Sequence, residues 1–401
     1  MKYLDRFIKY VKIDTQADDT TGVTPSTEKQ KDLSKILVEE LKTLGVEDAY
    51  MDEYGIVYGH ISGEGDRIGF NAHIDTALEV TDTNVKPQII HNYDGKDFKL
   101  NEKYTLSAKE FPHLLNHLGH DLVVTDGNTL LGADDKAGIA IIMSMVEYFH
   151  EHPEVKHHPI SIAFTVDEEI GEGSLHFSLE KMNADYAFTC DGANINYVDY
   201  ENFNAYGVNL KVNGVAVHPG EGKNALINAL LIINDFINDM PKGETPFEAN
   251  EDEGYWHINS IEGSSESASL DMIIREFDNS LMKKRINGIK DTVKKLEAKY
   301  PKAKIECNIK YQYENMKPYV DKDPRAVEVA NKALIKNGLT PVHTKIRGGT
   351  DGATFSKMGL VTPNLGTGSA NHHGPFEYLV IQDFLKEIDI IVDILTIKPE
   401  K

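Results

Sequence analysis

Histidine and carboxylate side chains follow several apolar segments of this 401-residue sequence, at points where strands are expected to end. The first example is His73-Ile74-Asp75, at the end of the apolar segment 68–73. Residues two apart on a strand share one face, so Asp75 can reach the His73 imidazole or lie beside it. A carboxylate placed in this way orients and polarises a histidine that ligates a metal. By itself, however, such a pair is more typical of a structural contact.

Three further acidic groups follow apolar runs or expected strands. They are Asp134-Asp135 after residues 130–133, Asp167-Glu168-Glu169 after the strand 159–166, and Asp191 after the strand 185–190. In isolation, the first group favours a helix cap and the second a solvated loop. Their recurrence favours convergence, because the carboxyl ends of strands in an open α/β sheet form one ligand crevice. So many oxygens, with one or two imidazoles, suit Zn²⁺, Mn²⁺ or Co²⁺.

Two other segments offer imidazoles. His372-His373 lies between glycine-containing segments, and these constrain the loop that carries it. His218-Pro219-Gly220 follows an apolar strand, from which His218 can swing over the acidic crevice or merely cap the helix that follows.

Two arginines also stand out. Arg275 ends an alternating strand that begins near Leu270, and Arg347 precedes a glycine-rich segment. Arginine suits bidentate binding of a carboxylate. Each could instead pair with an internal acid, since this acidic chain has many.

A polar segment from about residue 81 to 126 has weak periodicity and is interpreted as an insertion. It contains histidines at near-helical spacing, His113, His117 and His120. We expect these three to be surface residues of the insertion.

The order of the expected elements predicts two domains. A helix should follow Pro25-Ser26-Thr27-Glu28, with Ser26 or Thr27 as its cap. Within 206–315 the order is strand, helix, two strands, helix, strand, which is that of a ferredoxin-like unit. The flanking segments mix helices and strands. We therefore predict a discontinuous larger domain, residues 1–205 and 316–401, which carries an inserted smaller domain, residues 206–315.

The composition narrows the class of protein. There are 64 acidic and 42 basic residues, and the formal net charge is -22. Such a surface repels phosphate backbones and anionic lipids, so we expect no nucleic-acid or membrane partner. Two cysteines fit a reducing compartment, and the N-terminal segment lacks the apolar core of a signal peptide. We expect a cytoplasmic protein.

Taken together, these segments resemble the dinuclear-zinc metallopeptidase family M20, and within it the aminotripeptidases. The similarity runs nearly from end to end. It rests on the order and spacing of Pro25–Glu28, His73–Thr76, Asn84–Ile89, Leu130–Gly138, Asp167–Glu169, Glu201–Ala205, His218–Gly220, Ile274–Asp278, Ile346–Gly352 and His373-Gly374. The resemblance implies an α/β fold: a zinc-peptidase-like mixed-sheet catalytic domain with an inserted ferredoxin-like α+β lid domain.

The resemblance also implies two Zn²⁺ ions per chain, with Mn²⁺ or Co²⁺ as alternatives. The family's histidine ligand directly precedes a glycine, which selects His373 over His372. The peptide bond between the paired aspartates is cis in the family. The implied ligands are His73, Asp134 and Asp191 for one ion, and Asp134, Glu169 and His373 for the other.

The remaining site residues receive roles from the same resemblance. Asp75 would orient His73, and Glu168 would be the general base. The lid would send His218 towards the scissile carbonyl. Arg275 and Arg347 would hold the C-terminal carboxylate of a small peptide substrate.

These roles imply an aminopeptidase that removes the N-terminal residue from tripeptides. A dipeptidase or an N-acyl amino acid deacylase would keep the same site with a different pocket, but residues 84–88 favour the aminotripeptidases. A non-catalytic metal-dependent binding protein is disfavoured, because Glu168 is present. The lid often mediates dimers in relatives, so the resemblance leaves a homodimer open without requiring one.

Overall fold

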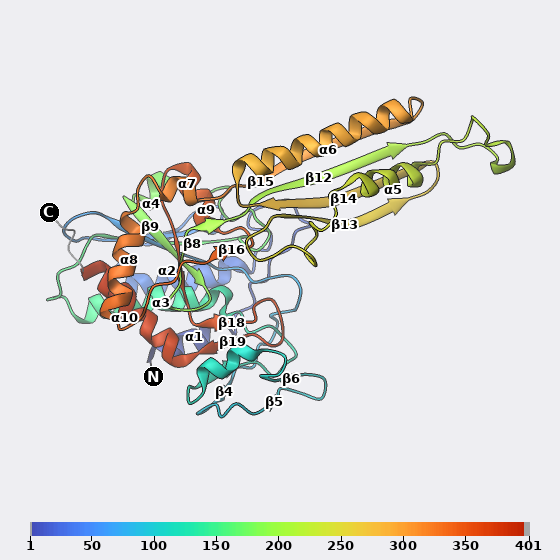
Figure 1. Ribbon diagram of the computed structural model, residues 1–401. Helices are drawn as coiled ribbons and strands as arrows, with labels where there is room; N and C mark the ends of the chain where they lie inside the picture. The colour runs from blue at the N-terminus through green and yellow to red at the C-terminus, as the bar shows by residue number, and fades with distance from the viewer. Residues whose placement is uncertain (1, 397–401) are drawn as a thin grey trace. The chain divides into compact units, whose positions relative to one another are not determined.

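The computed structural model describes residues 2–396 (Figure 1). The chain forms two compact units. The larger takes residues up to 200, then 318–344 and those from 350 on, and the smaller takes 201–317 and 345–349. The smaller unit therefore also includes a short segment from the C-terminal third, because β16 (Lys345–Ile346) pairs in parallel with β11 (Glu201–Asn202).

A seven-stranded mixed sheet forms the centre of the larger unit. Its order is β1 (Tyr50–Met51), β2 (Val57–Ile61), β8 (Ile160–Thr165), β3 (Ile68–His73), β9 (Tyr186–Gly192), β17 (Asn364–Gly366) and β10 (Val198–Asp199). The strands from β8 to β17 are parallel, and the outer pairings are antiparallel. Every residue of β3 and β8 is buried, as expected for parallel strands covered on both faces.

Helices complete the larger unit. They are α1 (Lys2–Tyr10), α2 (Gln30–Thr43), α3 (Ala133–Glu151), α4 (Leu179–Met182), α8 (Arg325–Lys336), α9 (Asp351–Met358) and α10 (Ile381–Thr396), with α7 (Lys317–Val320) at the junction of the units. α3 packs on β3 and β9, with α1 and α10 against it. Gly138 allows this close packing, because a Cβ atom there would lie 1.9 Å from the Cys190 carbonyl oxygen. α3 is thereby held with its N-terminus beside the ends of the parallel strands.

The segment interpreted as an insertion forms part of a second sheet. Its order is β18 (Ser369–Ala370), β19 (Tyr378–Val380), β7 (Leu122–Val124) and β4 (Gln88–Ile90). The same segment also forms the strand pair β5 (Phe98–Lys99) and β6 (Thr105–Leu106) and the 3₁₀ helix η1 (Pro112–His117). Tyr93, Leu114 and Tyr378 belong to a buried apolar cluster of this region. The polar segment is therefore ordered around a small apolar core that it shares with β19.

The smaller unit has the predicted ferredoxin-like element order. Its antiparallel sheet runs β13 (Tyr255–Gly263), β14 (Ser267–Glu276), β12 (Asn204–Asn213) and β15 (Lys304–Tyr313), with helices α5 (Ala229–Asp239) and α6 (Asn279–Lys299) and the 3₁₀ helix η2 (Pro219–Glu221). Burial alternates along β14, so its inward residues share one core with α5 and α6. The predicted fold class is confirmed.

Candidate metal centre

The carboxyl ends of the parallel strands bring the acidic segments together. His73 is the last residue of β3, Glu168 and Glu169 follow β8, and Asp191 lies near the end of β9. Asp134 reaches the same edge from the start of α3, where Gly132 has a positive φ of 77° and the Asp134-Asp135 peptide bond is cis. The structure thus places at one sheet edge the side chains that the sequence distributes over more than a hundred positions.

Two groups of potential ligands share Asp134. In one, His73 Nε2 lies 3.0 Å from Asp134 Oδ1 and 3.5 Å from Asp191 Oδ1. In the other, His373 Nε2 lies 3.3 Å from Asp134 Oδ2 and 3.1 Å from Glu169 Oε2. Within each group the donor atoms lie within 4.8 Å of one another. Asp134 therefore offers one carboxylate oxygen to each group.

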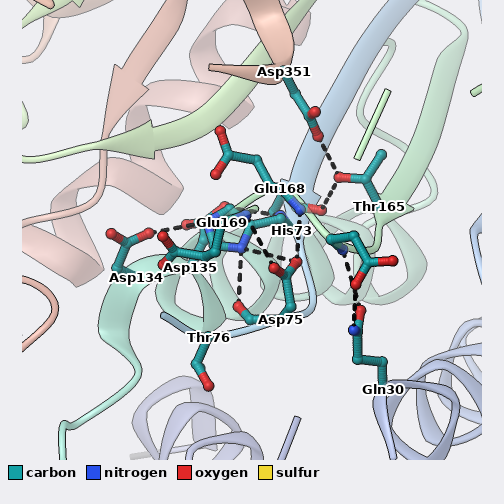
Figure 2. A network of polar contacts seen from close by, with 12 residues as sticks. Gln30, His73, Asp75, Thr76, Asp134, Asp135, Thr165, Glu168, Glu169 and Asp351 are labelled. Atoms are coloured by element: carbon teal, nitrogen blue, oxygen red, sulfur yellow. Dashed lines mark hydrogen bonds and ion pairs between the residues drawn. The ribbon is translucent and has the colours of Figure 1, made fainter. Parts of the chain in front are cut away.

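Asp75 organises the site from beneath (Figure 2). Its Oδ1 accepts a hydrogen bond from the Glu168 backbone N at 3.1 Å, and its Oδ2 accepts one from the Glu169 backbone N at 3.0 Å. The Asp75 carbonyl lies 3.0 Å from His73 Nδ1. A carbonyl oxygen only accepts, so Nδ1 carries a proton, and Nε2 is the ring nitrogen that faces Asp134.

The electrostatics of the site indicate a missing positive charge. Burial raises the pKa of Glu169 to about 8, with repulsion from Asp134 adding to the effect. Asp134 and Glu169 in turn raise the pKa of His373 to about 11. Glu169 Oε1 is buried without a hydrogen-bond partner among the described residues. Buried carboxylates concentrated in this way are stable only when protons or cations compensate them, and imidazole and carboxylate donors suit Zn²⁺. The donor set therefore fits metal ions.

Glu168 stands apart from its neighbour Glu169. It belongs to neither ligand group. Burial raises the pKa of its carboxyl well above the usual range of a glutamate, and Asp191 and Asp351 add repulsion, while His73 acts in the opposite direction. Its backbone N–H is held by Asp75, so the residue lies next to Glu169 of the second group without joining either group.

The comparisons with known proteins agree with this geometry. The profile of peptidase family M20/M25/M40 matches residues 121–396. Peptidase T of Clostridium perfringens is 45% identical over 404 aligned residues, which cover 100% of both chains. The chain belongs to peptidase family M20/M25/M40. The resemblance found in the sequence is thus confirmed.

Solved structures share the fold of this family member. Aminopeptidase PepT from Bacillus cereus has a TM-score of 0.78 at 22% identity, over 98% of this chain and 97% of its own. A tripeptidase from Staphylococcus aureus also has a TM-score of 0.78, at 21% identity and the same coverage. A dinuclear metal-binding peptidase of family M20 from Bacillus subtilis has 0.67 at 12% identity, over 98% of this chain and 96% of its own.

Three predicted residues lie in the smaller unit. His218 is exposed at the start of η2, where its Nδ1 accepts a hydrogen bond from the Gly220 backbone at 3.2 Å. The Arg275 guanidinium lies over the Tyr313 ring and donates to Gln312 Oε1 at 2.9 Å.

Arg347 is held by backbone and rings of the same unit. It donates to the Asn250 carbonyl at 3.0 Å and to the Glu251 carbonyl, and it lies over the rings of Phe203 and Tyr255. The sequence left open whether each arginine pairs with an internal acid. At these contacts both arginines instead bind neutral groups.

Several supporting residues escaped the sequence analysis. The Glu377 carboxylate accepts hydrogen bonds from the backbone of Leu131, Gly132 and Asp134, at 2.7 to 3.0 Å, and so shapes the turn that presents Asp134. Asp351 accepts a hydrogen bond from the Thr165 hydroxyl at 2.6 Å, and its pKa is raised to about 6, chiefly by burial. The available signals were weak: Asp351 lies in the glycine-rich segment 348–352, and Glu377 closely follows Gly374-Pro375.

No helix within residues 2–396 is long and apolar enough to cross a membrane.

Proposed function

We propose that this chain is a metal-dependent aminopeptidase that hydrolyses the N-terminal residue from tripeptides. The observation that carries the proposal is the sharing of Asp134 by two ligand groups while Glu168 remains outside both. The substrate class is supported by similarity to peptidase T and to a solved tripeptidase. We place the enzyme in the cytoplasm, where reducing conditions suit the free Cys190 and Cys307.

In this proposal two Zn²⁺ ions occupy the groups, with Mn²⁺ or Co²⁺ as substitutes. His73, Asp134 and Asp191 hold one ion, and Asp134, Glu169 and His373 hold the other. Bound in pairs, such ions act as Lewis acids on a peptide carbonyl and lower the pKa of water. The backbone carbonyl of Asp75 keeps His73 in the tautomer that can ligate, a common role of a carbonyl or carboxylate behind a metal ligand.

The proton transfers fall to Glu168. One of its carboxylate oxygens accepts a proton from the attacking water, and the same oxygen returns that proton to the leaving amine. Its buried surroundings suit this task, since they raise the pKa of its carboxyl above that of an exposed glutamate and so make the carboxylate a stronger base. We assign His218 to the carbonyl oxygen of the scissile bond. It would be the catalytic histidine of a lid formed by the smaller unit, and the larger unit would be the catalytic domain.

A panel of peptides tests the function. The metal-depleted protein, reconstituted with Zn²⁺, should release the N-terminal residue of free tripeptides faster than it cleaves di-, tetra- or N-acylated peptides. Chelation should abolish this activity, and Zn²⁺, Mn²⁺ or Co²⁺ should restore it. Faster cleavage of dipeptides, or of N-acyl amino acids, would instead assign the chain to the alternatives within the family. No hydrolysis of any peptide by the metal-loaded protein would leave only the non-catalytic binding role.

Arg275 and Arg347 are proposed to bind the C-terminal carboxylate of the substrate. Arg275→Ala should raise KM for free tripeptides by about 10- to 100-fold, because a charge-assisted hydrogen bond contributes about 1.5–3 kcal/mol. KM for the amidated tripeptides should hardly change. Initial-rate measurements on matched free and amidated peptides check this. Arg325→Ala is the control, since Arg325 forms an ion pair with Asp323. An equal rise in KM for both kinds of peptide would rule out carboxylate binding.

A further inference from the structure

A third group of potential metal ligands lies in the larger unit, apart from the two that share Asp134. It consists of His117 at the end of η1, His120 three residues later, and Asp383 in the first turn of α10. η1 and α10 are far apart in the sequence, so the fold, and not local spacing, brings these three side chains together. The expectation that these histidines are simple surface residues is therefore incomplete.

The geometry of this group suits a cation better than a hydrogen-bonded cluster. The three donor atoms lie within 4.8 Å of one another. His117 Nδ1 lies 3.7 Å from Asp383 Oδ2, which is too far for a hydrogen bond. Two ligands of one tetrahedral Zn²⁺, with bonds of about 2.0–2.2 Å, lie about 3.5 Å apart. A small inward rotation of the side chains therefore brings them to ligand spacing.

The protonation state of the group also suits a metal. His117 and Asp383 are mostly buried, with side-chain exposures of 17% and 20%. Burial, aided by His120 and His113, lowers the pKa of His117 to about 4, which favours the neutral imidazole that a metal needs, whereas burial raises the pKa of Asp383. His120 Nδ1 is buried and has no hydrogen-bond partner among the described residues.

A second, independent observation comes from Glu387, one helical turn beyond Asp383. Glu387 is 1% exposed, and neither of its carboxylate oxygens has a hydrogen-bond partner within residues 2–396. Burial raises the pKa of Glu387 well above its usual range, and Asp383 adds repulsion. Because the carboxylates of Asp383 and Glu387 repel each other when both are ionised, a divalent cation bound to Asp383 would offset that repulsion.

The group is also accessible. A cavity of about 340 Å³ is lined by His117, Asp383, Tyr378, Ser369 and His372, among others. An ion can enter through it, and a water molecule can complete the coordination, as in zinc sites that have three protein ligands. We propose that His117, His120 and Asp383 bind a third Zn²⁺ ion, separate from the catalytic pair.

The consequence of such an ion would be structural. It would connect η1, which belongs to the 81–126 segment, to α10. This would stabilise a segment whose apolar core is small. The same region contacts the loop that carries His373, because His113 Nε2 lies 3.0 Å from Asn371 Oδ1. We expect the third ion to raise the thermal stability of the protein and to leave the chemical step unchanged.

Metal counting on the full-length protein tests the proposal. After removal of all metal and titration with Zn²⁺ alone, the wild type should bind one ion more per chain than His117→Gln, His120→Gln or Asp383→Asn. Zn²⁺ at saturation should raise Tm further in the wild type than in these variants. His91→Asn is the matched control, because His91 is a neighbouring exposed histidine that pairs with Asp121; it should bind as many ions as the wild type.

A measurement on the wild type alone guards against misfolded variants. Diethylpyrocarbonate modification, mapped by mass spectrometry, should spare His117 and His120 only when Zn²⁺ is present. Equal metal counts in the wild type and in all three variants would overturn the proposal, and so would equal modification with and without Zn²⁺. The test compares the number of bound Zn²⁺ ions per chain in the wild type with that in each variant. If the catalytic centre failed to bind its two ions, the number would fall equally in all of these proteins, and the difference of one ion would remain.

Discussion

Glu168→Ala should lower kcat for tripeptides by about 10²- to 10⁴-fold and leave the two catalytic ions in place. That loss is the usual contribution of a general base or acid. The metal content should be unaffected because Glu168 belongs to neither ligand group, although it directly precedes Glu169. The measurements are steady-state kinetics and metal analysis on the same protein preparation.

Glu169→Ala is the matched control for that experiment. Glu169 Oε2 lies 3.1 Å from His373 Nε2, within the second ligand group. Its removal should lower the occupancy of one ion as well as the activity. Glu168→Gln keeps the shape of the side chain and removes its basicity, so it should be as inactive as Glu168→Ala. If Glu168→Ala lost metal and Glu169→Ala kept it, the roles of the two glutamates would have to be exchanged.

The location of the metal centre could be predicted from the sequence, because the chemistry follows from strand ends. His73 and Asp191 follow apolar runs whose length and burial mark them as central strands. Parallel strands end at one edge of the sheet, so the sequence pattern alone predicts that the two side chains meet. The structure places them 3.5 Å apart.

The choice between neighbouring residues could not be derived from pattern alone. His372 and His373 are equivalent by composition, and only the family resemblance selected His373. In the structure His373 Nε2 lies near both Asp134 and Glu169, whereas His372 Nδ1 lies 3.5 Å from Asp134 Oδ2 and its Nε2 lies 2.9 Å from the Ser369 hydroxyl. Only His373 also reaches Glu169, and its positive φ of 62° has no signature in the sequence.

Contacts between segments that lie far apart in the sequence could not be predicted either. Ser26 was expected to cap a helix, but α2 begins at Gln30 and has no side-chain cap. Ser26 and Gln30 instead hydrogen-bond to the carboxylate of Asp167, with distances of 2.5 and 2.6 Å to its Oδ1. These contacts fix the turn before Glu168, at a positive φ of 59° for Asp167. Serine and glutamine are common at the starts of helices. The sequence therefore indicated helix capping and gave no sign of their hydrogen bonds to Asp167.

The sharing of Asp134 by both ligand groups leads to a prediction with a still larger effect. Asp134→Ala should lose both catalytic ions, since one oxygen of this carboxylate faces His73 and the other faces His373. His373→Ala removes a ligand from one group only, so it should lose one ion and retain the other. Metal analysis after gel filtration in metal-free buffer distinguishes two, one and no retained ions per chain at this centre.

The activity should follow the same order. Loss of both ions removes several kcal/mol of transition-state stabilisation, so kcat/KM of Asp134→Ala should fall by more than about 10⁴-fold. The fold itself should persist, because α3 is anchored by its buried residues and Glu377 still binds the backbone at positions 131, 132 and 134. The Tm values of the metal-free wild type and the metal-free variant should therefore be similar. If Asp134→Ala folded normally and still held one ion as tightly as the wild type, Asp134 would serve a single ion, and the bridged arrangement proposed for this centre would be wrong.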